Sequence, residues 1–369
     1  MIRWSIKSIF TEGMSMLASV CGVAFSFLLV MFFSAMFSGE SDRITAYPSK
    51  VNADVWVMQK GVANMHMAMS QLWDWKEDRV RAIDGVAAVE SILYLNAVFN
   101  AGGRDWFTYI VGLTGRTEYS GPWSMHSGKR IPENGEVVIP EVLSRLTDMN
   151  IGDSVNIVDR QFTIVGLSAE TFSMANSIVF VSYADLAEIM SSQGSVSYLM
   201  VRADESVAPA ELVKRIGDQL DKVNVLTQDV FINNDHHMAM QMGVEIIAMM
   251  SVIGSALAVL IVGFTSHALI SRRQRELAIA KALGFRNRDI YMSVLVLTMI
   301  LTLSGFLLSI LFTTLLFPLI NQAVPAVSLK FTLESTLDTA VIAIMIAALA
   351  ALWPARQVVK VDPLTVFHG

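Results

Sequence analysis

Long apolar stretches are the feature of this sequence that most constrains its fold. Three of them, residues 14–38, 244–270 and 290–317, are long enough to cross about 30 Å of hydrocarbon as helices, which takes about 20 residues. A fourth, residues 336–353, is shorter and ends at Pro354. A hydrophobic share of 53% with only 16% charged residues fits membrane spans combined with a soluble block. We therefore predict an α-helical membrane protein with four transmembrane helices, one followed by three.

The first apolar stretch is predicted to be a retained anchor rather than a cleaved signal peptide. Its apolar run is longer than the core of a signal peptide, and no Ala-x-Ala-like cleavage site follows at positions 38–41.

Basic residues in the short loops predict how the spans are oriented. Residues 271–289 are rich in arginine and lysine, whereas residues 318–335 carry only Lys330. Cytoplasmic loops carry the excess of basic residues, so both termini are predicted to be cytoplasmic. The predicted cytoplasmic parts are an amphipathic segment 1–13, the segment 271–289 and the tail 354–369. Residues 39–243 and the short loop 318–335 then lie outside.

The predicted external block, residues 39–243, is acidic. It holds 16 basic and 26 acidic residues, a balance of −10, which leaves 11 basic and 7 acidic residues, a balance of +4, for the rest of the chain. The lone Cys21 cannot pair within the chain, which excludes a disulfide-rich scaffold. The overall charge of −6 argues against nucleic acid as a partner.

Alternating strand-like and helix-like segments predict that this external block is an α+β domain. Residues 89–99 and 106–113 resemble a pair of strands separated by the turn Asn100-Ala101-Gly102-Gly103, which predicts a hairpin. Helical spacing extends from Leu72 to Ile83. Residues 197–227 read as a strand, a helix and a second strand.

Catalytic motifs are absent from the sequence. It contains no Gly-x-Ser-x-Gly, His-Glu-x-x-His or Cys-x-x-Cys string and no nucleotide-binding loop. We therefore expect no enzymatic activity and no cofactor in this chain, and we expect any ATP and Mg²⁺ to be bound by a partner subunit.

The basic segment between the second and third spans carries the most specific pattern. From Arg273 to Gly284 it reads Arg-Gln-Arg-Glu-Leu-Ala-Ile-Ala-Lys-Ala-Leu-Gly. The pattern predicts a short amphipathic helix that continues from the second span and ends at Gly284. An apolar face with flanking charges suits docking into a groove of a soluble partner.

This string resembles the coupling-region signature of the FtsX/MacB-type (type VII) permeases of ABC transporters. That signature is Glu-(Ile/Leu)-x-x-(Leu/Met)-(Lys/Arg)-Ala-(Leu/Ile)-Gly, from which Ala280 departs because a larger apolar residue is usual there. The C-terminus resembles the family's Pro-Ala-Arg…Asp-Pro ending. The matching residues there are Pro354, Ala355, Arg356, Asp362 and Pro363.

The resemblance implies a permease subunit without ATPase activity of its own. Its partners would be two ABC ATPase subunits, a second permease copy in a homodimer, membrane lipid and, as a further option, a periplasmic adaptor protein. The location would be the bacterial cytoplasmic (inner) membrane, with a MacB-like core domain outside. The residues placed at the ATPase contact are Arg272, Arg273, Arg275, Glu276, Lys281, Ala282, Leu283 and Gly284.

Two functions remain open on this resemblance. The first is ATP-driven export or extraction of a hydrophobic or amphipathic substrate, such as a lipid, peptide, drug or haem-like compound. The alternative is a non-transporting mechanotransmission complex that activates an envelope partner such as a cell-wall hydrolase.

Two windows rich in methionine and histidine are the candidate substrate residues. The first comprises Met58 and residues 65–69, and the second comprises residues 236–242 with Glu245, Met249 and Met250. Together they hold nine of the 22 methionines. The candidates are Met65, His66, Met67, Met69, His236, His237, Met238, Met240, Met242 and Glu245. Three hypotheses remain open: a soft-ligand site for haem or Cu(I), a pliable apolar surface for variable cargo, and simple packing.

Overall fold

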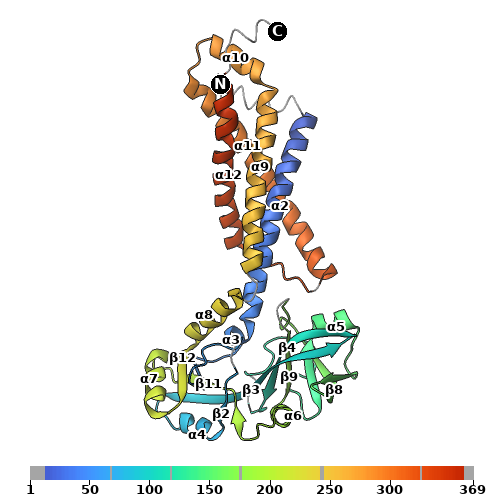
Figure 1. Cartoon of the computed structure of the whole chain (residues 1–369), viewed down its shortest axis with the longest axis vertical. Coiled ribbons are helices and arrows are strands. Elements are labelled where there is room, and N and C mark those ends of the chain that lie inside the picture. Colours follow the sequence, from blue (N-terminus) through green and yellow to red (C-terminus); the bar gives the residue numbers. More distant parts are fainter. Residues whose placement is uncertain are drawn as a thin grey trace. The chain divides into compact units, whose positions relative to one another are not determined.

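The computed structural model describes residues 13–66, 69–116, 119–173, 177–241, 245–324 and 326–360. They form two compact units, which we treat separately (Figure 1). The helical unit comprises the described residues up to Ser38, from Glu245 to Ala323 and from Leu329 onward. The α/β domain comprises the described residues between Gly39 and Gln241 together with the segment Val324–Ser328. Residues 1–12 of the predicted N-terminal segment lie outside the described residues.

Among the described residues, three helices are long and apolar enough to cross a membrane. They are α2 (Gly13–Ile44), α9 (Glu245–Ser271) and α11 (Asn287–Ala323). A further helix, α12 (Leu333–Lys360), contains the shorter apolar stretch Ser335–Ala351. Three of the four predicted spans thus coincide with helices of spanning length, and the fourth coincides with this shorter stretch.

Two of these helices continue through prolines at which the sequence suggested an end. The helix α11 runs through Pro318 to Ala323, so the start of the predicted external loop is helical. The helix α12 runs through Pro354 to Lys360. A proline removes one backbone hydrogen bond. In an apolar setting, ending the helix would leave more backbone groups without partners, and neighbouring helices and Ser/Thr side chains compensate for the lost bond.

Small and aromatic residues allow α2 and α11 to approach closely inside the helical unit. A Cβ atom added at Gly305 of α11 would lie 2.5 Å from Val23 Cγ1 and 3.1 Å from the Ala24 backbone nitrogen of α2. At the next residue, the Phe306 ring packs edge to face against the Phe27 ring, with 5.8 Å between the ring centroids. Where the hydrophobic effect contributes little to helix association, small residues let two helices pack through close contact of their backbones.

The α/β domain is built on a ten-stranded mixed sheet. The order of nine strands is β12-β1-β11-β3-β4-β9-β6-β8-β5, and β7 pairs with β3 and β8. The strands are β1 (Val55–Gln59), β3 (Val86–Ala101), β4 (Arg104–Leu113), β5 (Met125–Gly128), β6 (Glu136–Pro140), β7 (Ser154–Ile157), β8 (Arg160–Ser168), β9 (Ser177–Ser182), β11 (Tyr198–Ala203) and β12 (Val223–Thr227). The strands β2 (Leu72–Trp73) and β10 (Ser195–Val196) form a separate pair.

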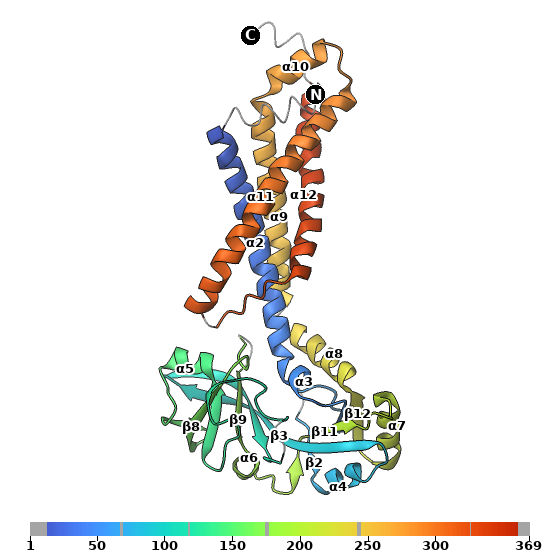
Figure 2. The same ribbon diagram turned by 180° about the vertical axis from the view of Figure 1, so that it is seen from behind.

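Short helices flank this sheet at both ends. They are α3 (Ala46–Lys50), α4 (Trp75–Arg81), α5 (Glu141–Thr147), α6 (Tyr183–Ile189), α7 (Pro209–Gln219) and α8 (Gln228–Ala239). Figure 2 shows α7 beside β12 and α4 beside β2 at one end of the domain, and α5 beside β8 at the other. The domain is therefore of mixed α and β composition, as the alternating pattern predicted.

The predicted hairpin is confirmed. Strands β3 and β4 pair antiparallel from Ile92↔Leu113 to Ala101↔Arg104. The connecting residues Gly102 and Gly103 both have positive φ angles, of 59° and 72°. A two-residue hairpin loop of this kind requires positive φ at both positions, which glycine adopts without steric cost.

One other prediction is wrong, and a second is confirmed with a strand order that the sequence did not indicate. Helical spacing suggested one helix from Leu72 to Ile83, but residues 72 and 73 form the strand β2, and α4 begins at Trp75. The pairing of Leu72 with Val196 buries Leu72 from a strand, and tertiary pairing outweighs local spacing here. The predicted strand–helix–strand unit over 197–227 exists, but β1 lies between its two strands, antiparallel to both.

Apolar residues fill both faces of the sheet. On β3, Ile92 and Tyr94 enter one buried cluster while Leu93 enters another. On β1, Trp56 and Met58 enter the first cluster while Val57 enters a third. Because successive strand residues point to opposite faces, these runs place core on both sides. Neighbouring residues of one strand thus enter different core clusters, so the sheet is covered by apolar residues on both faces.

Candidate functional sites

The predicted coupling helix is α10 (Gln274–Ala282), and it is separate from α9. The helix α9 ends at Ser271, and residues 272 and 273 form a turn in which the Arg273 N–H donates to the Ile270 carbonyl at 2.9 Å. The prediction of a helix continuous with the second span is therefore wrong. The turn changes the direction of the chain before α10 begins.

The end of α10 at Gly284 is confirmed. Gly284 has a φ angle of 89°, and its N–H donates to the Lys281 carbonyl at 3.1 Å. The Phe285 N–H donates to the Ala280 carbonyl at 3.3 Å. This pair of bonds around a left-handed residue is a Schellman motif, which glycine favours because it has no Cβ atom.

The helix α10 packs on the helical unit through a narrow face and exposes the opposite one. Ala278 is buried, with Gln274 and Lys281 half-buried beside it, and α10 contacts α11 and α12. The exposed face carries Arg275, Glu276, Ile279 (41% exposed) and Leu283 (75% exposed). Two branched apolar side chains thus face away from the protein, flanked by a cation and an anion.

The remaining predicted coupling residues divide between this surface and the interior. Arg272, Ala282 and Gly284 are exposed, whereas Arg273 is only 5% exposed within the helical unit. The sequence did not distinguish Arg273 from its neighbours, because a run of arginines does not indicate which of the side chains is buried.

The C-terminal motif is described only in part. Pro354, Ala355 and Arg356 lie on α12, of which the backbone is described at these positions. Asp362 and Pro363 lie outside the described residues.

Met65 and His66, predicted as substrate ligands, lie in the core of the α/β domain. Met65 belongs to the buried cluster around Trp56, and His66 is 4% exposed. His66 Nδ1 lies 2.6 Å from Asp235 Oδ1 on α8, and the same oxygen accepts a hydrogen bond from the Met65 N–H at 2.9 Å. This buried pair therefore ties the segment before Met67 to α8, the helix that also carries His236 and His237.

Tyrosine rings enclose this buried pair. The Tyr109 ring packs edge to face against the rings of His66 and Tyr94, with centroid distances of 5.2 Å and 5.3 Å. Burial raises the pKa of the Tyr94 and Tyr198 hydroxyls well above the usual value, so both are neutral. The cavity beside them is about 10 Å³, about the minimum for one water molecule. This part of the windows has no room for haem.

The other members of the windows are more accessible. Met69 and His237 are exposed, Met238 and Met240 are half-buried, and Glu245 is exposed at the start of α9. The His236 Nε2 lies 2.6 Å from the Ser41 hydroxyl. Met67 and Met242 lie outside the described residues. Over the residues that the structure describes, no group of three or more His, Cys, Asp or Glu side chains is arranged to hold a metal ion.

Asp235 was not identified from the sequence. It lies 169 residues from His66, and a single acid at that distance gives no sequence signal of its partner. Its second carboxylate oxygen, Oδ2, is buried and has no hydrogen-bond partner among the described residues. A water molecule in the adjacent cavity would satisfy that oxygen.

Along the chain, the α/β domain lies between the first two apolar helices, and the short helix α10 lies between the next two. This arrangement is that of a multi-pass membrane protein. Two family models match the chain: the FtsX-like permease C-terminal model over residues 248–363 and the MacB-like periplasmic core domain model over residues 13–219. The second alone covers more than half of the sequence. The chain belongs to the FtsX/MacB-type family of ABC transporter permeases.

Relatives of known sequence are consistent with this assignment. An uncharacterized ABC transporter permease of Mycobacterium tuberculosis is 24% identical over 324 residues, covering 86% of this chain and 85% of the relative. An uncharacterized ABC transporter permease of Methanocaldococcus jannaschii is 20% identical over 360 residues, covering 89% and 84%.

Two solved structures are similar to part of the chain. The periplasmic region of MacB from Actinobacillus actinomycetemcomitans has a TM-score of 0.39 at 11% identity, covering 50% of this chain and 94% of that one. The extracellular domain of the noncanonic ABC-type transporter YknZ from Gram-positive bacteria has a TM-score of 0.36 at 11% identity, covering 47% and 100%.

Proposed function

We propose that the chain is the permease subunit through which a separate ABC ATPase drives movement of the α/β domain. The observation that carries this proposal is the exposed face of α10, where Ile279 and Leu283 are accessible between Arg275 and Glu276. An apolar pair flanked by opposite charges fits a groove in a soluble protein, because burial gives affinity and the charges fix the register.

The attachment of α10 supports a role in transmitting force. Its C-terminal end is fixed by the two hydrogen bonds around Gly284, and Ala278 packs directly on the helical unit. A short helix held at its end and along one face moves as a unit with the helices it contacts. Displacement by a docked ATPase would therefore reach α11 and α12 rather than dissipate in a loop.

The assembly that follows from this proposal has two permease copies and two ATPase subunits in a bacterial cytoplasmic membrane. The basic segment 271–289 supports a cytoplasmic position for α10, with both termini on the same side and the acidic α/β domain on the other. The stretch Ser335–Ala351 serves as the fourth span in this arrangement.

Reversal of one charge on α10 tests the ATPase contact. In full-length permease co-expressed with its partner ABC ATPase, we expect Glu276→Lys to reduce ATPase co-purification at least tenfold. The reason is that a like-charge contact at an interface costs several kcal/mol. Leu283→Asp tests the apolar part of the same face and should give a similar loss, since Leu283 is 75% exposed and its replacement leaves the core unchanged.

The matched control is Glu205→Lys, an exposed charge reversal on the α/β domain. We expect it to leave ATPase co-purification unchanged. Undiminished co-purification with both α10 variants, at normal expression, would contradict the proposal.

For the cargo, we propose a hydrophobic or amphipathic compound exported or extracted from the membrane. The accessible Met69 and His237 support soft or apolar contacts with it, since thioethers adapt to varied apolar shapes. If this cargo is haem or Cu(I), titration of the purified protein with haemin or Cu(I) will give a Soret shift or tight binding that is reduced in Met69→Leu and His237→Ala. Absence of both signals removes haem and Cu(I) and leaves lipidic or peptidic cargo.

A mechanotransmission role is the second candidate, and α10 serves it equally well. The two functions separate on one measurement with the reconstituted permease and ATPase in vesicles. Transport requires ATP-dependent loss of a lipid-soluble cargo from the membrane, whereas mechanotransmission changes the activity of an envelope partner without any such loss.

A further inference from the structure

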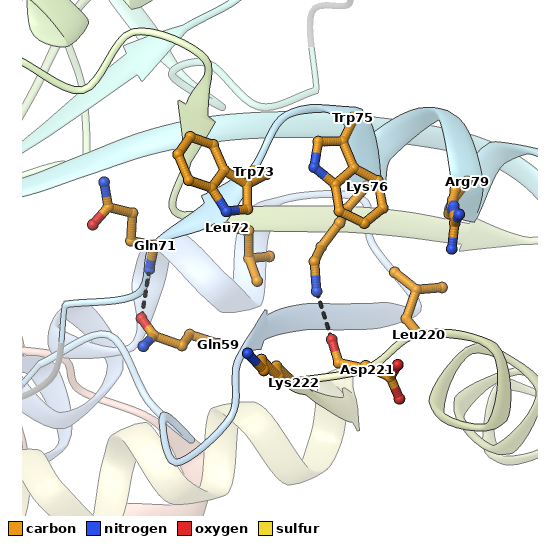
Figure 3. Close-up of a pocket in the computed structure, with 10 residues that line it drawn as sticks. All are labelled: Gln59, Gln71, Leu72, Trp73, Trp75, Lys76, Arg79, Leu220, Asp221 and Lys222. Atoms are coloured by element: carbon orange, nitrogen blue, oxygen red, sulfur yellow. Dashed lines mark hydrogen bonds between the residues drawn. The ribbon is translucent and has the colours of Figure 1, made fainter.

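A pocket of about 360 Å³ lies in the α/β domain between α4, β2 and the segment that precedes β12. Its size falls within the range of small-molecule sites. Figure 3 shows Trp73 and Trp75 on one side and Lys222 and Asp221 on the other, with the Lys76 side chain reaching across. The proposed coupling function uses none of these residues.

Two tryptophans form an accessible apolar surface on this pocket. Trp73 is 61% exposed and Trp75 is 49% exposed. The pairing of β2 with β10 buries Leu72, and strand alternation then turns Trp73 outward. Exposed large aromatic rings that line a concave site supply flat contact area for a ligand ring.

Cationic groups outnumber acids in the pocket. Lys76, Arg79 and Lys222 line it together with a single carboxylate, that of Asp221, a local balance of +2. The surrounding residues 39–243 carry a balance of −10, so this excess runs against the charge of the domain. The Arg79 guanidinium carbon lies 5.0 Å from the centre of the Trp75 ring, which holds cation and ring together.

Lys76 is the cation that the fold positions most firmly. Its side chain is buried, and its ammonium donates to the Asp221 backbone carbonyl at 2.6 Å. An ammonium carries three N–H groups, so two remain for a ligand or for water. Burial lowers the pKa of Lys76, because its charge has lost hydration that a neighbouring anion would replace.

Hydrogen bonds hold the two sides of the pocket in place without a ligand. The Gln71 N–H donates to Gln59 Oε1 at 3.1 Å, and the Lys60 N–H donates to the Lys222 carbonyl at 3.1 Å. The Lys76 bond to Asp221 crosses the pocket itself. The site is therefore preformed, which lowers the entropic cost of binding.

We propose that this pocket binds a small organic anion that carries a flat apolar ring. The anionic group would accept hydrogen bonds from the Lys76 ammonium and the Arg79 guanidinium, while the ring would lie against Trp73 and Trp75. This inference does not rest on the proposed coupling function, and its test requires no ATPase.

The test is equilibrium dialysis of full-length protein in detergent against empty micelles, with 2-naphthoate as the probe. We expect 2-naphthoate to bind at least tenfold more tightly than neutral 2-naphthamide, since a hydrogen bond to a charged group favours the anion by about that factor. Acetate in hundredfold excess should not displace it, because acetate lacks the ring.

Three variants assign the binding to the pocket. We expect Lys76→Met and Arg79→Gln each to weaken 2-naphthoate binding about tenfold while leaving 2-naphthamide binding unchanged. Trp73→Ala should weaken both. Arg79 and Trp73 are exposed, so their variants keep the fold even where Lys76→Met reduces stability. The control is Lys214→Met, an exposed lysine on α7 away from the pocket lining.

Three results would overturn the proposal. The first is no binding of 2-naphthoate above the micelle control, and the second is equal affinity for the acid and the amide. The third is binding that is the same in Arg79→Gln, Trp73→Ala and the control.

Discussion

Replacing Asp235 by alanine is expected to destabilise the α/β domain by about 2–6 kcal/mol, because it leaves two buried hydrogen-bonding groups without their acceptor at about 1–3 kcal/mol each. The change removes the acceptor of both the His66 imidazole and the Met65 N–H, and both residues are buried. For a domain of this size the loss corresponds to a fall in Tm on the order of 10 °C. Thermal unfolding of the full-length protein in detergent, followed by tryptophan fluorescence, measures it.

Two further variants make this result specific. Asp235→Asn keeps one oxygen that can accept a hydrogen bond and should lose only about 1–3 kcal/mol. Asp218→Ala removes an exposed aspartate of α7 and should change stability by less than about 0.5 kcal/mol. A Tm for Asp235→Ala that matches the Asp218→Ala control would contradict a structural role for the pair.

The same experiment bears on what the methionine- and histidine-rich windows do. For Met65 and His66 the structure favours packing among the hypotheses drawn from the sequence. A ligand role for His66 would require the Asp235 contact to open. For the accessible residues Met69 and His237 the cargo role stays a prediction, and these are the residues to test.

Local patterns predicted those parts of the fold that local interactions determine. The hairpin at Gly102-Gly103 and the end of α10 at Gly284 depend on positive φ angles, which glycine marks in the sequence. The exposed face of α10 followed from residue spacing on a helix, although the inward turn of Arg273 did not.

Contacts between distant segments were beyond such patterns. The buried pair of His66 and Asp235 joins residues 169 positions apart, and the spacing from Leu72 onward looked helical until pairing with Val196 was known. The pocket around Lys76 brings Gln59, α4 and residues 220–222 together, which no single stretch of sequence indicates. Membrane helices were recognised from composition, but their ends were not, because Pro318 and Pro354 are accommodated inside helices.

Replacing Gly305 by leucine is expected to disrupt the packing of α2 on α11. Even a Cβ atom at this position lies 2.5 Å from Val23 Cγ1, and the next closest atoms include the α2 backbone. Overpacking of a close helix contact costs about 1–3 kcal/mol, and a four-carbon side chain against backbone belongs at the upper end of that range or above it. We expect a lower Tm and a smaller yield of monodisperse protein in detergent.

The matched control is Gly263→Leu on α9. A Cβ atom there meets nothing within 4 Å, so the same substitution should be tolerated. Equal loss of Tm in both variants would show that the effect comes from losing a glycine in an apolar helix rather than from the contact with α2.

The position of β1 between β11 and β12 has a mechanical consequence. The chain enters the sheet at Val55 and leaves it at Thr227, and these two residues are direct partners in the antiparallel ladder. The Gln228 N–H extends the ladder by donating to the Asp54 carbonyl at 2.9 Å. Pulling the two ends apart loads the ladder in an unzipping geometry, in which pairs break one at a time. Moving both ends together in the same direction breaks no pair of this ladder. The domain therefore moves as a whole when both ends are displaced together, whereas the ladder opens when the ends are pulled apart.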